Sequence, residues 1–61
     1  MIFEKVEEMV KKEGISISKL ETNCNIGNGT ISKWKTSSPT IANLKKVADY
    51  FGVPIEYFLE E

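Results

Sequence analysis

The sequence has no histidine and only one cysteine, Cys24, among its 61 residues. Without histidine there is no ordinary general base near neutral pH, which argues against an enzyme. One thiol cannot form a disulfide or a zinc site within the chain, and an unpaired cysteine is typical of a reducing compartment. We therefore expect no metal and no cofactor, and we expect Cys24 to pack in a core.

Long apolar runs are also absent. No stretch approaches the about 20 residues needed to span a membrane, and the N-terminal segment MIFEKVEEMVKKEG does not resemble a signal peptide. A chain this short forms one domain, here residues 1–61, with a marginal core. A cytoplasmic protein without membrane contact is expected.

The net charge of −1 gives no support to a nucleic-acid partner, but its distribution is uneven. Residues 17–46 carry five lysines and one glutamate, whereas residues 47–61 carry four acidic residues and no basic one. A basic middle between acidic ends fits a molecule that presents one face to a polyanion. Ordinary solvated surface charge would give the same distribution.

Apolar residues at helical spacing predict two short helices before position 25. The first is amphipathic and ends near Gly14, which can adopt the left-handed cap. The second covers about residues 17–24, with Ser16 as its N-cap. A capping box of Ser18 and Glu21 would instead start this helix one turn later.

Two more helices are predicted after Pro39. Thr40 and Gly52 are the expected caps of the longer one. Its apolar stripe comprises Ile41, Leu44, Val47, Ala48 and Phe51. The final segment is one short packed turn, with apolar residues Ile55, Phe58 and Leu59.

The stretch NIGNGTISKW, residues 25–34, has three interpretations. Asn28-Gly29 between apolar runs is a hairpin signal, and with Thr30 it is also a formal N-glycosylation acceptor, which would require secretion. A helix, unlike a strand, places Ile31 and Trp34 on one face. We therefore predict a helix over residues 28–35 that starts after Gly27, with Trp34 as a packing residue.

The outer face of this predicted helix is polar and contains small side chains. It comprises Asn28, Gly29, Ser32, Lys33 and Thr36. Amides, hydroxyls and an ammonium group are suited to hydrogen bonding with base edges in a major groove. The glycines at 27 and 29 allow a close approach of the backbone. The glycine-rich GNGT lacks the lysine of a P-loop.

The segment GISISKLETNCNIGNGTISKWKTSSPTIANLKKVADYFGV, residues 14–53, resembles the Cro/CI-type (XRE-like) helix-turn-helix domain of phage and bacterial repressors. The matching features are Ser16, Leu20, an apolar Cys24, the turn Asn25-Ile26 and TISKW. The resemblance implies an all-α, compact five-helix, lambda-repressor-like domain with its motif at about 16–36. Two positions differ: Glu21 stands where a small residue is usual, and Asn25 where glycine is usual.

The resemblance also implies a function and a set of contacts. A sequence-specific DNA-binding transcriptional regulator is expected, acting as a repressor, as a homodimer on a dyad-symmetric double-stranded operator, in a bacterial or phage-infected cell. The implied base-reading residues are Asn28, Gly29, Ser32 and Lys33. The implied phosphate contacts are Ser16, Ile17, Ser18, Lys19, Gly27, Lys35, Thr36, Ser37, Ser38 and Thr40.

Two alternatives remain open from the sequence. Tyr57 and Phe58 are candidate dimer contacts, although either aromatic ring can instead complete the core. The acidic pI of about 5.4 favours a second function, a protein-interaction module built on the same fold. If Lys19, Lys33 and Lys35 lie on one surface, DNA binding is favoured over this protein-interaction function.

Overall fold

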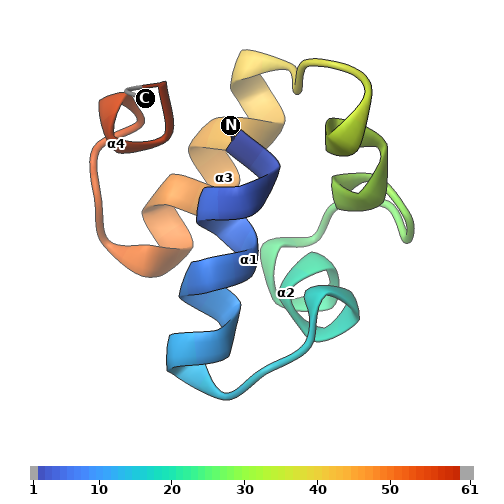
Figure 1. Ribbon diagram of the computed structural model, residues 1–61, viewed down its shortest axis with the longest axis vertical. Helices are drawn as coiled ribbons and strands as arrows, with labels where there is room; N and C mark the ends of the chain where they lie inside the picture. Colours follow the sequence, from blue (N-terminus) through green and yellow to red (C-terminus); the bar gives the residue numbers. More distant parts are fainter. Residues whose placement is uncertain (1, 60–61) are drawn as a thin grey trace.

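The computed structural model describes residues 2–59 and is all-helical over that range (Figure 1). The elements in chain order are α1 (Ile2–Glu13), α2 (Ile17–Cys24), the 3₁₀ helix η1 (Ile31–Lys35), α3 (Ile41–Phe51) and α4 (Glu56–Leu59). The all-α class is confirmed. The count of five α-helices is not, because the third helical segment is a short 3₁₀ helix.

The predicted helix ends are largely confirmed. The Oγ atom of Ser16 accepts a hydrogen bond from the backbone N–H of Lys19 at 3.0 Å, so α2 starts at the earlier of its two predicted positions. Thr40 caps α3 in the same way, with 3.2 Å between its Oγ1 and the nitrogen of Asn43. Asn25 ends α2 in the left-handed conformation, with φ of 59°.

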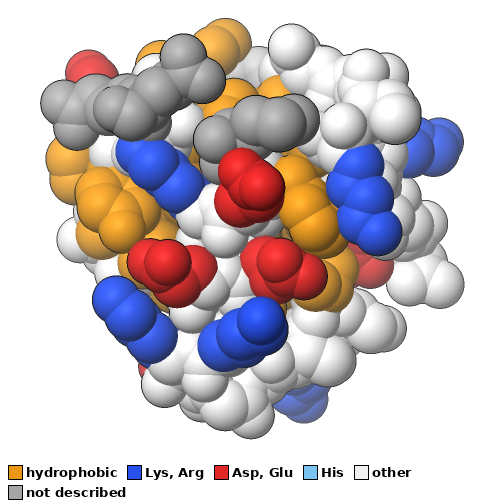
Figure 2. Space-filling model, in the orientation of Figure 1, with side chains coloured by type: hydrophobic (Ala, Val, Ile, Leu, Met, Phe, Trp, Pro, Cys, Tyr) orange, Lys and Arg blue, Asp and Glu red, His pale blue; other side chains and the backbone are white. Residues whose placement is uncertain are grey.

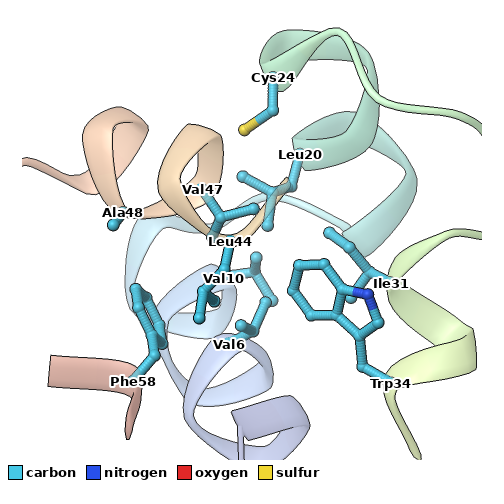
Figure 3. Close-up of a cluster of buried hydrophobic side chains, with 10 residues drawn as sticks. All are labelled: Val6, Val10, Leu20, Cys24, Ile31, Trp34, Leu44, Val47, Ala48 and Phe58. Atoms are coloured by element: carbon cyan, nitrogen blue, oxygen red, sulfur yellow. The ribbon is translucent and has the colours of Figure 1, made fainter. Parts of the chain in front are cut away.

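The core lies between α1 and the other helices (Figure 3). Its buried members are Val6, Val10, Leu20, Cys24, Ile31, Trp34, Leu44, Val47, Ala48 and Phe58. Helix α1 packs against α2, η1 and α4, and α2 also packs against α3. This arrangement holds one side of η1 in the core and leaves the other side at the surface.

Two residues predicted to face the core are exposed. Ile41 is 63% exposed, because it is the first residue of α3 and lies one turn before Leu44, where the buried stripe begins. Leu59 is 51% exposed, since a single helical turn cannot direct both Leu59 and its neighbour Phe58 inward.

None of the helices within residues 2–59 has the length and apolar character that crossing a membrane requires.

Candidate nucleic-acid interface

The predicted helix over residues 28–35 is wrong in its first turn. Residues 28–30 form a turn, and helical structure starts at Ile31. Gly29 has φ of +86°, which a right-handed helix excludes. Gly27 is therefore not the N-cap, a position that belongs to Thr30. Asn28 and Gly29 accordingly lie in the turn before η1.

The 3₁₀ geometry sorts the side chains of η1 into three faces, because residues three apart lie above one another. Ile31 and Trp34 form the buried face, with exposed fractions of 0% and 5%. Lys33 shares a second face with Thr36, and its N–H donates to the carbonyl of Thr30 at 3.2 Å. The third face holds Ser32 and Lys35.

The four predicted base-reading residues all lie in the turn and η1. Asn28, Ser32 and Lys33 are exposed, and Gly29 is half-buried. A Cβ atom at Gly29 would meet nothing within 4 Å, so the backbone conformation, rather than lack of space, requires glycine there. The structure thus presents an amide, a hydroxyl and an ammonium group on one exposed segment.

The predicted phosphate contacts flank this segment. At the start of α2, Ser16, Ser18 and Lys19 are exposed, whereas Ile17 is half-buried and packs against the core. After η1, the hydroxyls of Thr36, Ser37 and Ser38 are exposed. An open pocket of about 270 Å³ lies beside them. Its lining comprises Ile2, Trp34, Lys35, Thr36, Ser37, Ser38 and Pro39.

Lys35 is turned toward α1, away from Lys33. Its Nζ atom lies 5.1 Å from the centroid of the Phe3 ring, which is a cation–π arrangement. A second open pocket, of about 280 Å³, is lined by these two residues and by Glu4 and Glu7. Lys33 and Lys35 therefore lie on different faces of η1, and the phosphate role of Lys35 stays a prediction.

The charged side chains are unevenly spread over the face in Figure 2. Acidic side chains gather near its centre, over α1, and lysines surround them. The right-hand side, where α2 and η1 lie, shows uncharged polar groups and backbone over most of its area and lysine side chains in its upper part. This part of the surface therefore offers hydrogen-bonding groups together with positive charge.

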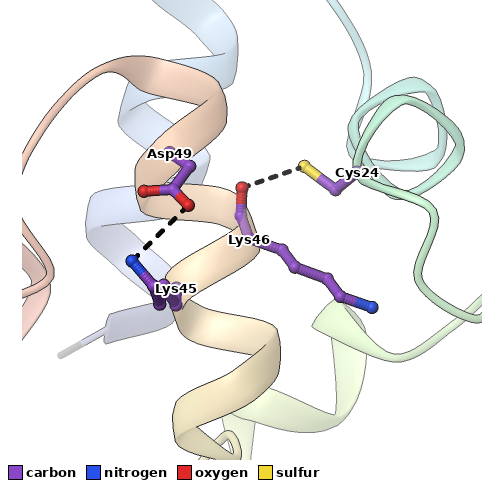
Figure 4. A network of polar contacts seen from close by, with 4 residues as sticks. All are labelled: Cys24, Lys45, Lys46 and Asp49. Carbon is purple, nitrogen blue, oxygen red and sulfur yellow. Dashed lines mark hydrogen bonds and ion pairs between the residues drawn. The ribbon is translucent and has the colours of Figure 1, made fainter.

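Cys24 is a packing residue. Burial raises the pKa of its thiol, and the ammonium group of Lys46 offsets only part of that rise. The Sγ atom lies 3.8 Å from the carbonyl oxygen of Lys46 (Figure 4). On α3, the helix that contains Lys46, Lys45 and Asp49 form an exposed ion pair at 3.7 Å. A thiol with a raised pKa stays protonated near neutral pH, as a core cysteine does.

Glu21 has a role that the sequence did not reveal. It is 3% exposed, and its carboxylate accepts two backbone hydrogen bonds, from Gly29 to Oε1 at 3.1 Å and from Ile31 to Oε2 at 2.9 Å. The available signal was an acidic residue at a motif position where the Cro/CI pattern has a small one. The buried carboxylate connects α2 to the exposed turn.

Comparison with known proteins agrees with this geometry. The family model described as Helix-turn-helix matches residues 6–58, which is most of the chain. No curated protein and no solved structure matches this sequence. Two helical segments, α2 and η1, joined by the turn at Asn25, occupy the motif positions. The chain therefore belongs to the helix-turn-helix family, as a Cro/CI-type domain of the kind found in DNA-binding transcription regulators.

Proposed function

We propose that this domain binds double-stranded DNA sequence-specifically and represses transcription in the cytoplasm of a bacterial or phage-infected cell. One observation supports this most strongly: Asn28, Ser32 and Lys33 are exposed on a segment whose opposite face, Ile31 and Trp34, is held in the core. A surface that reads DNA needs polar groups at fixed positions, and this anchoring fixes them.

In the proposed complex, the turn at Asn28 and helix η1 enter the major groove, and α2 crosses the backbone beside it. The amide of Asn28 can pair with adenine N6 and N7, and the ammonium group of Lys33 with guanine O6 and N7. Phosphate oxygens accept hydrogen bonds at the start of α2, around Ser16, and from the hydroxyls of residues 36–38. The base contacts would supply specificity and the phosphate contacts orientation.

A homodimer is part of this proposal. Helix η1 has five residues, so one domain contacts few base pairs. Two domains related by a two-fold axis would read two half-sites about one helical turn of DNA apart. Phe58 is 1% exposed in the single chain and completes the core, which is one of the two alternatives left open from the sequence, so we do not include it in the proposed dimer contact. Tyr57 is half-buried and remains the candidate.

Selection of bound duplexes from a random pool tests the proposed function. We expect a single enriched motif with dyad symmetry, because a dimer of identical reading segments requires two inverted half-sites. A pool that stays random after several rounds would contradict sequence-specific binding. It would favour the protein-interaction module, whose partner would then be sought among proteins.

Binding should weaken as salt is added. Each phosphate neutralised contributes a slope of about −0.9 to the log–log dependence of affinity on salt, because counterions are released. Lys19→Gln should lower this slope by about one unit. Lys45→Gln is the matched control, since Lys45 already pairs with Asp49 on α3, and should leave it unchanged. Titration at four salt concentrations measures the slope. Equal slopes in the wild-type protein and both variants would contradict the assignment of Lys19 to a phosphate contact.

Tyr57→Asp should weaken binding to the full operator while the domain stays folded. The Nζ atom of Lys5 lies 5.2 Å from the Tyr57 ring centroid and donates to the Tyr57 carbonyl at 2.8 Å. A carboxylate there can face Lys5 within the monomer but would be desolvated at a dimer contact. Sedimentation with a full site and with a half-site measures the effect, with Tyr50→Asp on α3 as the control. A wild-type monomer bound to a full site would contradict a dimer.

A further inference from the structure

The turn that carries Asn28 has few local hydrogen bonds to stabilise it. Thr30 occupies the N-cap position of η1 but makes no side-chain capping bond. The backbone bond from Thr30 to the carbonyl of Gly27, at 3.1 Å, closes the turn on itself without attaching it to another element. A five-residue 3₁₀ helix adds little, because its hydrogen-bond geometry is poor.

The carboxylate of Glu21 makes that attachment. Its two oxygens accept from residues 29 and 31, which lie on either side of Thr30, so the end of the turn and the start of η1 are both tied to α2. Hydrogen bonds to an ionised carboxylate are stronger than those between neutral groups. No other charged side chain in residues 2–59 is buried. A backbone bond from Ile26 to the carbonyl of Glu21, at 3.0 Å, holds the start of the connection, and the Glu21 carboxylate holds the part that follows Asn28.

We propose that Glu21 is a positioning residue that sets base specificity through Asn28 without contacting DNA. This inference rests on the proposed function. By holding the N–H of Gly29, the carboxylate fixes the backbone next to Asn28, and so fixes where the amide of Asn28 meets a base edge. Lys33 is less dependent on it, because Ile31 and Trp34 anchor its helix in the core.

Two substitutions separate positioning from simple stability. Glu21→Gln keeps the size and burial of the side chain, but one of its two terminal groups becomes a donor that faces a backbone N–H, so one of the two bonds is lost. Glu21→Ala removes both bonds and leaves two N–H groups without this acceptor. If the alanine variant does not fold, the glutamine variant alone carries the test.

The experiment measures base preference at each position of the selected operator. Asn28→Ala first identifies the base pair that Asn28 reads, and Lys33→Ala identifies the pair read by Lys33. In Glu21→Gln we expect the preference at the Asn28 pair to fall by roughly fivefold, and the preference at the Lys33 pair to be retained. The double variant with Asn28→Ala should lose no more preference at that pair than Asn28→Ala alone, because coupled residues are not additive.

Two controls exclude a general effect. Asn23→Ala removes another α2 hydrogen bond, from Asn23 to the Tyr50 hydroxyl at 3.1 Å, away from the turn. Val47→Ala lowers stability from within the core. If Glu21→Gln lowers affinity uniformly, as Val47→Ala does, and keeps the preference at the Asn28 pair, the positioning role is wrong. Absence of any base preference in the wild-type protein would instead overturn the proposed function, and the positioning role with it.

Discussion

Phe58→Ala is expected to lower the free energy of unfolding by about 3–5 kcal/mol, the usual cost of removing a buried aromatic ring. Phe58 is 1% exposed and is the only buried residue of α4, a helix that packs against α1. A domain of 61 residues has a total stability of about 3–9 kcal/mol. The loss therefore brings the domain close to unfolding.

Urea denaturation followed by tryptophan fluorescence measures this effect. Trp34 is the only tryptophan and is 5% exposed, so its emission reports on the core directly. Leu59→Ala is the matched control, since Leu59 is the next residue but 51% exposed, and should cost about 1 kcal/mol or less. Equal losses in the two variants would contradict the inward orientation of Phe58.

The second large effect is expected for Lys33→Ala, which should lose about 1–3 kcal/mol of binding free energy on the preferred duplex and relax the choice at one base pair. In a 3₁₀ helix the step of two positions from Lys33 to Lys35 corresponds to about 240° of rotation. Lys33 therefore points to the proposed groove side, where the ammonium group can reach a guanine edge.

Lys35→Ala is the comparison. Because the Lys35 ammonium lies over the Phe3 ring, any DNA contact it makes is expected at a phosphate and not at a base. This variant should weaken binding to the preferred and to a scrambled duplex alike and lower the salt slope by about one unit. Titration of both variants against both duplexes distinguishes them. If Lys33→Ala weakens the two duplexes equally, the assignment of Lys33 to base reading is wrong.

The helix ends were predictable because their determinants are local. Ser16 and Thr40 cap the helices that follow them, and Gly14 and Gly52 adopt the left-handed conformation, each with φ of +71°. Such signals act within a few residues of the chain, so the sequence alone contains them.

The start of η1 at Ile31 was not predictable in the same way. The spacing of Ile31 and Trp34 fits an α-helix and a 3₁₀ helix equally well. The deciding contacts come from Glu21, eight and ten residues earlier in the chain. The prediction that Ile41 faces the core was wrong for a different reason. A periodic pattern indicates which face of a helix is apolar, but it does not indicate where along the helix the core ends.

The bonds at Gly29 also have a consequence for the chemical lifetime of the protein. Asn-Gly pairs age by deamidation: the glycine nitrogen attacks the asparagine side-chain carbonyl, ammonia leaves to give a cyclic imide, and water then opens the imide to an aspartate or isoaspartate carboxylate. Here that nitrogen donates its hydrogen to Glu21 at 3.1 Å, and Gly29 is fixed at φ of +86°, so the attack requires the turn to open first. We therefore expect Asn28 to persist longer in the folded domain than in the unfolded chain. Each deamidated molecule would carry an extra negative charge at the position proposed to face DNA.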